Sequence, residues 1–267
     1  MNNRTARHLR WLGVFAVGSL AALFLFVPAI PQTQEYHDFA DGRTLALRIP
    51  NTLNVLSNMG FAIAGVVGLL VARGSRRFAN DLERGDARMF FIGTLLTAIG
   101  STIYHLTPSD GTLVYDRLGM IVAFMPFLAM MIHERYEGAR WLLPVLLIVG
   151  AASVWWWRTF DDLRLYGWVQ FFPMVCVFVI PILDRPRHTR EALALSAVVI
   201  AYATAKVLET FDHATFSATG GHVSGHTLKH LFAAGAPLTI ALWIRSRTSA
   251  ERIAPTVHAE LASADSL

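Results

Sequence analysis

The feature that most limits the fold of this chain is a series of apolar stretches. A helix needs about 20 mostly apolar residues to cross the hydrocarbon core of a bilayer. Only 16% of the residues are charged, against about 25% in an ordinary soluble domain, which argues against a soluble globule and excludes a disordered chain. We therefore expect an all-α fold, a polytopic transmembrane helical bundle. Its eight spans cover approximately residues 11–30, 52–72, 88–106, 115–133, 140–157, 165–183, 191–208 and 226–245.

The distribution of basic residues predicts how these spans are oriented. Cytoplasmic loops of membrane proteins carry an excess of Lys and Arg. Of the 23 basic residues, 16 lie on the side that holds both termini and four lie on the other side. We therefore expect both termini in the cytoplasm. The remaining three, Arg117, Lys206 and Lys229, lie within spans. The net charge of +4 thus reflects topology and does not indicate a nucleic-acid partner.

The first span follows three basic residues and could be read as a signal peptide. Its apolar stretch is long for that role, and Val27–Pro31 contains no convincing small-x-small cleavage site. We therefore expect a retained helix. The connections between spans are about 6 to 22 residues long, too short for a separate soluble domain, so a single bundle is expected.

Polar side chains inside the predicted spans gather near one membrane face. Such residues are unfavourable in hydrocarbon and often mark a functional site. Four groups stand out, at the external ends of the second, third, fourth and eighth spans. The predicted orientation rests on the basic residues and not on these polar groups. Their common depth therefore independently indicates one shared site. The groups are Asn54, Ser57 and Asn58; Ser101 and His105; Asp116; and His226 and His230.

Three of these residues have the pattern of a metal site. His226 and His230 are four residues apart, so both imidazoles lie on one face of a helix. With His105 from another span they provide three nitrogen ligands and leave a position open for water, as in catalytic zinc sites. The single cysteine, Cys176, excludes a site built from several thiolates. The alternative is that the histidines are solvated at helix ends.

Ser101 and Asp116 are the candidate catalytic groups beside the metal. Asp116 has two open roles, orienting an imidazole or acting as general base for a metal-activated water. Both residues also have structural interpretations. Ser101 can bond to the carbonyl one turn back, and Asp116 can pair with Arg117 at a helix start. The Asn54–Asn58 group is equally compatible with helix packing and with chemistry.

These motifs, in this order, resemble those of the alkaline ceramidase family. That family belongs to a superfamily of seven-helix membrane hydrolases that includes the adiponectin and progestin receptors. The similar region covers about residues 51–245. It implies a seven-helix core, to which 1–50 add one N-terminal helix and an external loop. The polar residues 246–267 are expected to form a disordered cytoplasmic tail. The residues that carry the resemblance are Asn54-Val55-Leu56-Ser57-Asn58, Ser101-xxx-His105, Asp116 within Tyr115–Met120, and His226-xxx-His230.

The resemblance implies a zinc-dependent hydrolase. His105, His226 and His230 would be the zinc ligands, and Ser101 and Asp116 would complete the site. The reaction would be hydrolysis of a lipid amide, such as a ceramide, to a fatty acid and a sphingoid base. The expected site faces the external, periplasmic side, and the expected partners are the lipid amide and membrane lipids. The oligomeric state is not indicated.

The chain departs from the family in the segment that binds calcium. Family ceramidases carry a Glu three residues before the Asn of the Asn-x-x-Ser-Asn element, and that position is Asn51 here. Asp38 and Asp41 precede it, but their spacing does not reproduce the calcium segment. Calcium is therefore doubtful, and so is ceramide as the particular substrate.

The acyl chain of the substrate is expected to lie between helices, and two other functions stay open. One is a b-type haem carrier, although haem needs histidines on opposite faces of its ring. The other is a lipid receptor in which zinc is structural. A transporter is disfavoured because the polar residues form no track across the bilayer. The residues expected to line the acyl site are Phe61, Phe91, Met120, Phe124 and Phe232.

Overall fold

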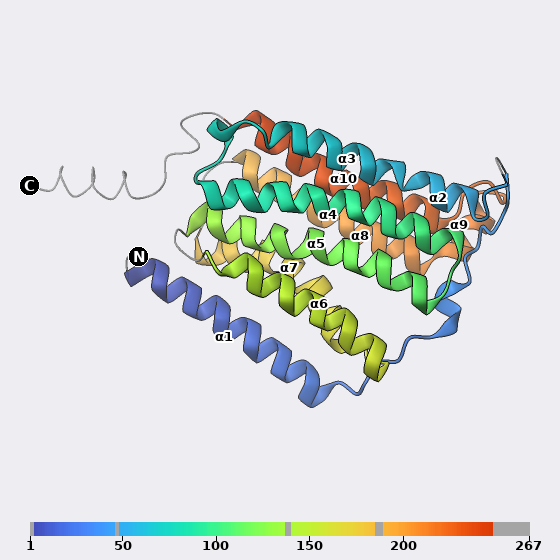
Figure 1. Ribbon diagram of the computed structural model, residues 1–267, viewed down its shortest axis with the longest axis horizontal. Helices are drawn as coiled ribbons and strands as arrows, with labels where there is room; N and C mark the ends of the chain where they lie inside the picture. The colour runs from blue at the N-terminus through green and yellow to red at the C-terminus, as the bar shows by residue number, and fades with distance from the viewer. Residues whose placement is uncertain (1–2, 46–47, 137–139, 185–188, 248–267) are drawn as a thin grey trace, which may run out of the picture.

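The computed structural model describes residues 3–45, 48–136, 140–184 and 189–247. These residues form an elongated helical bundle that contains no strand (Figure 1). The expected all-α membrane bundle is confirmed, because eight helical segments are long and apolar enough to cross a membrane. The elements are α1 Asn3–Phe26, η1 Gln34–His37, α2 Thr52–Ser57, α3 Met59–Val71, η2 Ser75–Arg77, α4 Asp81–Leu106, α5 Asp110–Arg135, α6 Leu142–Phe160, α7 Arg164–Leu183, α8 Thr189–Thr210, α9 Asp212–Ala218 and α10 Gly225–Ser246.

Three differences between the helix boundaries and the predicted spans affect the external end of the bundle. The first helix starts earlier and stops at Phe26, because Pro28 cannot continue a helix. The second span is interrupted at Asn58, between α2 and α3. The expected external loop before the last span contains the short helix α9. The predicted tail in 246–267 lies outside the described residues, apart from Ser246 and Arg247.

The first helix lies at the edge of the bundle (Figure 1). Only 6% of its apolar window is buried, against 22% or more for every other spanning segment. It packs mainly against α7. From its end, residues 27–45, here called the strap, run along the end of the bundle towards α2 and α9.

One end of the strap is fixed to the turn between α6 and α7. The Leu163 amide donates to the Ile30 carbonyl at 2.8 Å, and the Gln32 amide donates to Oδ1 of Asp161 at 3.0 Å. Asp162 accepts hydrogen bonds from the Arg164 side chain, which lower the pKa of its carboxyl group. These bonds hold the strap against the bundle.

The other end of the strap is fixed beside α9 and α10. The Ala40 amide donates to Oδ2 of Asp212 at 3.0 Å, and Oδ1 of the same carboxylate accepts from the His226 amide at 2.7 Å. In the middle, Nδ1 of His37 lies 2.8 Å from the Tyr104 hydroxyl at the end of α4. The strap is therefore tied to the helices that carry the polar residues.

Helices α4 and α5 approach so closely that only glycine fits between them. A Cβ atom at Gly93 would lie 2.0 Å from a backbone oxygen of α5, and one at Gly100 would lie 2.2 Å from the Tyr115 carbonyl oxygen. Gly100 directly precedes Ser101, and Tyr115 directly precedes Asp116. The glycine contact therefore sets the separation between the two candidate catalytic side chains.

We expect the substitution Gly100→Ala to destabilise the bundle by about 1–3 kcal/mol, as overpacking of a filled interior commonly does. The methyl group would meet backbone and not a flexible side chain, so α4 and α5 must separate. Thermal unfolding in detergent would measure the change. Gly13→Ala is the matched control, since a Cβ at Gly13 in α1 has nothing within 4 Å. Equal melting temperatures for the two variants would contradict the prediction.

The opposite end of the bundle is held by buried ion pairs. Arg247, which follows α10, pairs with Glu83 of α4 and Glu134 of α5. Arg135 pairs with Glu134 and with Glu191 of α8. Such a network links four helices, and removing one partner would leave a buried charge uncompensated. It anchors the end of the bundle remote from the histidines.

Candidate active site

The three candidate ligand histidines meet in one buried group. His105 comes from the last turn of α4, and His226 and His230 come from the start of α10. Nε2 of His105 lies 3.3 Å from Nε2 of His226 and 3.3 Å from Nε2 of His230. No side chain of the three is more than slightly exposed, with 4% of His226 accessible. The described residues therefore place three imidazole nitrogens around one point.

The donor set and its spacing fit a zinc ion. Zinc binds histidine nitrogen at about 2.0–2.1 Å in tetrahedral geometry, which places two such nitrogens about 3.3–3.4 Å apart. The two Nε2–Nε2 separations of 3.3 Å agree with this value. Three histidines also leave a fourth position for water or substrate.

His230 is oriented by the residues of α2. The Ser57 hydroxyl donates to the Asn54 carbonyl at 2.8 Å, so its oxygen accepts from Nδ1 of His230, also at 2.8 Å. The Asn54 carbonyl lies 3.2 Å from the same nitrogen. With its proton on Nδ1, His230 presents the Nε2 lone pair to the metal position, as ligand histidines in zinc proteins do.

Asn54 also fixes the start of α10. Its side-chain oxygen accepts from the Thr227 hydroxyl at 2.7 Å, next to the capping bond from the Thr227 amide to Ser224. The Asn54–Ser57 group therefore both packs helices and orients a candidate ligand, so the two interpretations of this motif are compatible.

We expect Ser57→Ala to weaken zinc binding about tenfold, because the loss of an outer hydrogen-bond partner of a ligand histidine typically has effects of this size. The Asn54 carbonyl remains as a partner and limits the loss. Competition with a fluorescent chelator would measure the affinity. Ser153→Ala is the control, since among the described residues the Ser153 hydroxyl bonds only within α6. Unchanged affinity in Ser57→Ala would contradict this role.

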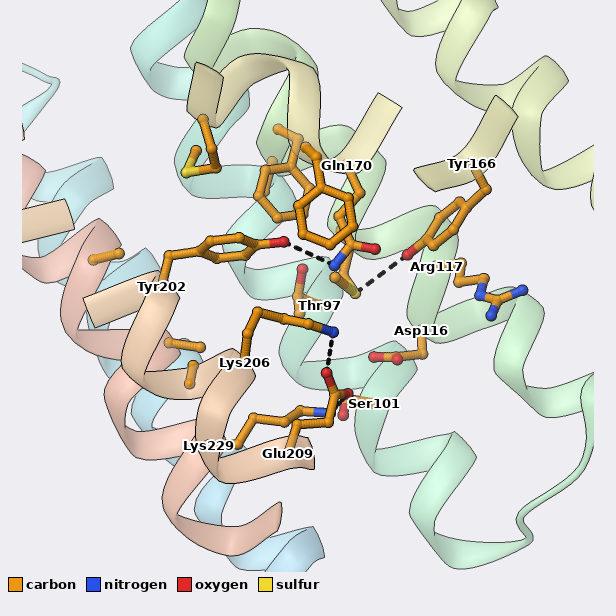
Figure 2. A pocket seen from close by; sticks show the side chains of 18 of the residues that line it. Thr97, Ser101, Asp116, Arg117, Tyr166, Gln170, Tyr202, Lys206, Glu209 and Lys229 are labelled. Carbon is orange, nitrogen blue, oxygen red and sulfur yellow. Dashed lines mark hydrogen bonds and ion pairs between the residues drawn. The ribbon is translucent and has the colours of Figure 1, made fainter. Parts of the chain in front are cut away.

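Ser101 and Asp116 lie next to each other beside the histidines. Both line a cavity of about 540 Å³ that also reaches His230, and Figure 2 shows their side chains facing its polar end. Both are largely buried, with Ser101 2% and Asp116 9% exposed. The cavity therefore joins the candidate metal ligands to the two candidate catalytic groups.

The other end of the cavity is apolar. Of the residues expected around an acyl chain, Phe61, Met120 and Phe124 line it. Phe91 is instead fully packed in the core between helices, and Phe232 is 45% exposed on the outside of α10. Other apolar residues that line the cavity are Phe90, Phe127, Val198, Pro237 and Ile240.

The strap contributes residues to the site that the sequence interpretation did not include. Phe39 packs its ring 4.7 Å from that of His105 and 4.6 Å from that of His226, between ring centroids. Gln32 and Tyr36 line the mouth of the cavity. No local pattern marks these residues, because their position depends on the bonds that fix the strap.

Asp41 of the strap and the nearby Asn51 each have a hydrogen-bond partner within the chain. Arg43 donates to both carboxylate oxygens of Asp41, at 2.7 and 2.8 Å, and these bonds hold the pKa of Asp41 below its ordinary value. The side-chain amide of Asn51 donates to the His105 carbonyl at 2.8 Å. Asp41 is thus engaged by Arg43, and Asn51 supports the end of α4.

Comparison with known proteins identifies the family. The model of the family described as Ceramidase matches residues 47–244. The chain belongs to the ceramidase family. Membership in this family of amide hydrolases, together with the eight apolar helical segments, makes the protein a multi-pass membrane ceramidase. The comparison with curated proteins found no match.

The arrangement of the three histidines in this ceramidase does not suit axial binding of a haem. Two axial histidines must lie on opposite faces of a planar ring. Here the Nε2 atoms of His105 and His230 are 3.3 Å apart, and the rings of His226 and His230 lie 4.9 Å apart on one helix face. The three side chains surround a point and not a plane.

Proposed function

We propose that the protein is an integral-membrane, zinc-dependent hydrolase that cleaves the amide bond of a ceramide-like lipid into a fatty acid and a sphingoid base. The observation that carries this proposal is the convergence of three histidine nitrogens, one of them from His230, which also lines a largely apolar cavity. His105, His226 and His230 would hold the zinc. The family to which the chain belongs supports amide hydrolysis as the reaction.

Zinc, when bound at such a site, lowers the pKa of water from about 15.7 towards 7 and polarises a carbonyl group. Asp116 accepts the proton of the attacking water and returns it to the nitrogen of the leaving amine. Ser101 donates a hydrogen bond to the carbonyl oxygen as negative charge develops there. Both side chains reach the cavity from the closely packed α4 and α5.

The cavity suits a substrate that comes from the bilayer. Its apolar end accommodates an acyl chain among aromatic and aliphatic side chains, and its polar end holds the amide near His230. The loops on the opposite side of the membrane carry the excess of basic residues. This distribution supports an external, periplasmic site with both termini cytoplasmic. In this proposal residues 51–245 form the hydrolase core, and 1–50 add a helix and the strap.

Incubation of the purified protein with N-dodecanoylsphingosine in mixed micelles tests the reaction directly. Mass spectrometry should detect dodecanoate and sphingosine in equal amounts, and chelation of zinc should stop their release. A protein that retains zinc and binds the lipid amide without releasing either product would be a receptor and would overturn the proposal.

A further inference from the structure

The strap, which runs along the end of the bundle (Figure 1), is fixed near both of its ends by the same local arrangement, an aspartate followed two residues later by an arginine. Arg43 donates to the Asp41 carboxylate from its backbone amide at 3.1 Å and from Nε and Nη2 at 2.7 and 2.8 Å. Arg164 donates to Asp162 from the same three groups, at 3.0, 3.0 and 2.8 Å. Two parallel bonds between a guanidinium and a carboxylate are strong and geometrically specific. We call these arrangements the Asp41 clamp and the Asp162 clamp.

Each clamp also joins two segments that are far apart in the sequence. In the Asp162 clamp, Nη1 of Arg164 donates to the Val27 carbonyl at the start of the strap, at 2.8 Å. In the Asp41 clamp, Nη2 of Arg43 donates at 2.8 Å to the carbonyl of His222, which lies between α9 and α10. The same guanidinium lies 5.1 Å from the ring centre of Phe216 in α9, within the range of a cation–π contact. One arginine of the chain therefore holds each end of the strap.

The Asp41 clamp lies in the part of the strap that covers the candidate metal ligands. Phe39, which packs on His226, precedes Asp41 by two residues, and His222 precedes His226 by four. The Asp41 side chain is 2% exposed, whereas that of Arg43 is 38% exposed. A buried carboxylate is unfavourable unless a partner compensates its charge. The Arg43 guanidinium provides this compensation and ties the segment that carries Phe39 to the turn before α10.

The described residues of this region do not fit a calcium ion. Calcium takes six to eight oxygen ligands, at about 2.3–2.6 Å. Both carboxylate oxygens of Asp41 already accept from the cationic side chain of Arg43. Asn51, at the position where the family carries a glutamate, directs its amide nitrogen at the His105 carbonyl. Asp38 is 77% exposed in its side chain. Within the described part of the chain, the acidic side chains of the strap belong to no group of three potential ligands.

We propose that Arg43 is a positioning residue that supplies the positive charge a bound calcium ion would otherwise supply. It clamps the strap so that Phe39 stays packed on His105 and His226, and closure of the strap is therefore independent of calcium. The clamp follows from contacts within the chain, whereas its effect on a bound zinc rests on the proposed function. Loss of the guanidinium would leave the buried Asp41 carboxylate without its charge partner and would release this end of the strap.

Hydrogen–deuterium exchange of the metal-free protein measures closure of the strap without any turnover. The Ala40 and Leu45 amides report on it, because both donate to side chains outside the strap. In Arg43→Ala we expect peptides from residues 34–45 to exchange about tenfold faster, the scale of one hydrogen bond to a charged group. Arg43→Gln replaces this variant if it does not fold. Arg158→Ala is the control, since Arg158 lies exposed at the end of α6 and should leave exchange unchanged.

Chemical rescue distinguishes the charge of Arg43 from a general effect of shortening its side chain. Millimolar guanidinium chloride should restore slow exchange in Arg43→Ala, because the planar cation matches the Asp41 carboxylate. Sodium chloride at the same concentration should not. Arg43→Lys, which keeps the charge without the planar fork, should exchange at an intermediate rate. Equal exchange of Arg43→Ala with either salt would overturn the role of the guanidinium.

Transfer of zinc to a chelator tests whether the clamp positions Phe39. Because Phe39 covers two of the candidate ligands, zinc should leave Arg43→Ala faster than the unaltered protein, by a factor similar to the gain in exchange. Arg164→Ala, which releases the other end of the strap, should speed exchange in residues 27–32 and have less effect on zinc transfer. Equal rates of zinc transfer in Arg43→Ala and the unaltered protein would overturn the positioning role.

Added calcium separates this inference from the proposed reaction. In buffer freed of calcium and supplied only with zinc, strap exchange and hydrolysis of N-dodecanoylsphingosine should equal the values in millimolar calcium. A strap that closes only with calcium would overturn the inference and leave the hydrolase in place. Unchanged exchange in Arg43→Ala would overturn it as well. A strap that closes without calcium and opens in Arg43→Ala, in a zinc-loaded protein that hydrolyses no lipid amide, would support the inference and overturn the proposed function.

Discussion

Asp116→Asn should lower kcat for a lipid amide by about 10²- to 10⁴-fold, the range attributed to a positioned general base. Asparagine has nearly the same shape as aspartate but cannot accept a proton from water. Because the two side chains have nearly the same shape, the substitution should not disturb the packing at this almost fully buried position beside Ser101. Steady-state hydrolysis at saturating lipid would measure the loss.

The zinc content of this variant distinguishes a base from a ligand. If Asp116 acts on protons only, Asp116→Asn keeps one zinc per chain while its turnover falls. Asp81→Asn is the control, since Asp81 lies exposed at the start of α4 and should retain full activity. Unchanged kcat in Asp116→Asn would remove the residue from the mechanism, and loss of zinc would make it a ligand.

His226→Ala should abolish both zinc binding and hydrolysis. Loss of an outer partner already weakens zinc sites by 10- to 100-fold, so loss of a direct ligand should weaken binding by more than about 100-fold. The bond from the His226 amide to Asp212 involves only backbone on the histidine side and survives the substitution. The fold of α10 should therefore be retained.

A second histidine near the same end of the bundle provides the control. His213 in α9 is 65% exposed in its side chain and lies outside the three-histidine group. His213→Ala should keep one zinc per chain and full turnover. Elemental analysis by mass spectrometry would measure the metal in both variants. Zinc at full stoichiometry in His226→Ala would contradict the assignment of this ligand.

The helical architecture and the histidine group follow from local patterns in the sequence. Apolar length alone gives the spans, and a separation of four residues places His226 and His230 on one helix face. His105 is placed at the same membrane depth as this pair because each of them lies at the external end of its predicted span. These relations require no knowledge of how the helices pack, so sequence reasoning could reach them.

The mouth of the cavity could not be derived in the same way. Phe39 and Tyr36 lie in a strap without helical periodicity, and their position depends on hydrogen bonds to Asp161 and Asp212 far along the chain. The closeness of Ser101 to Asp116 depends on the contact of two helix backbones at Gly100. Such long-range contacts leave no regular pattern in a single sequence.

Titration of zinc into chelator-treated protein tests most directly whether the three histidines hold a catalytic zinc. Hydrolysis of a lipid amide is followed as each increment of metal is added. We predict that activity rises linearly from near zero and reaches its maximum at one zinc per chain. Full activity in the metal-free protein, or one bound zinc without hydrolysis of any lipid amide, would contradict a catalytic zinc site.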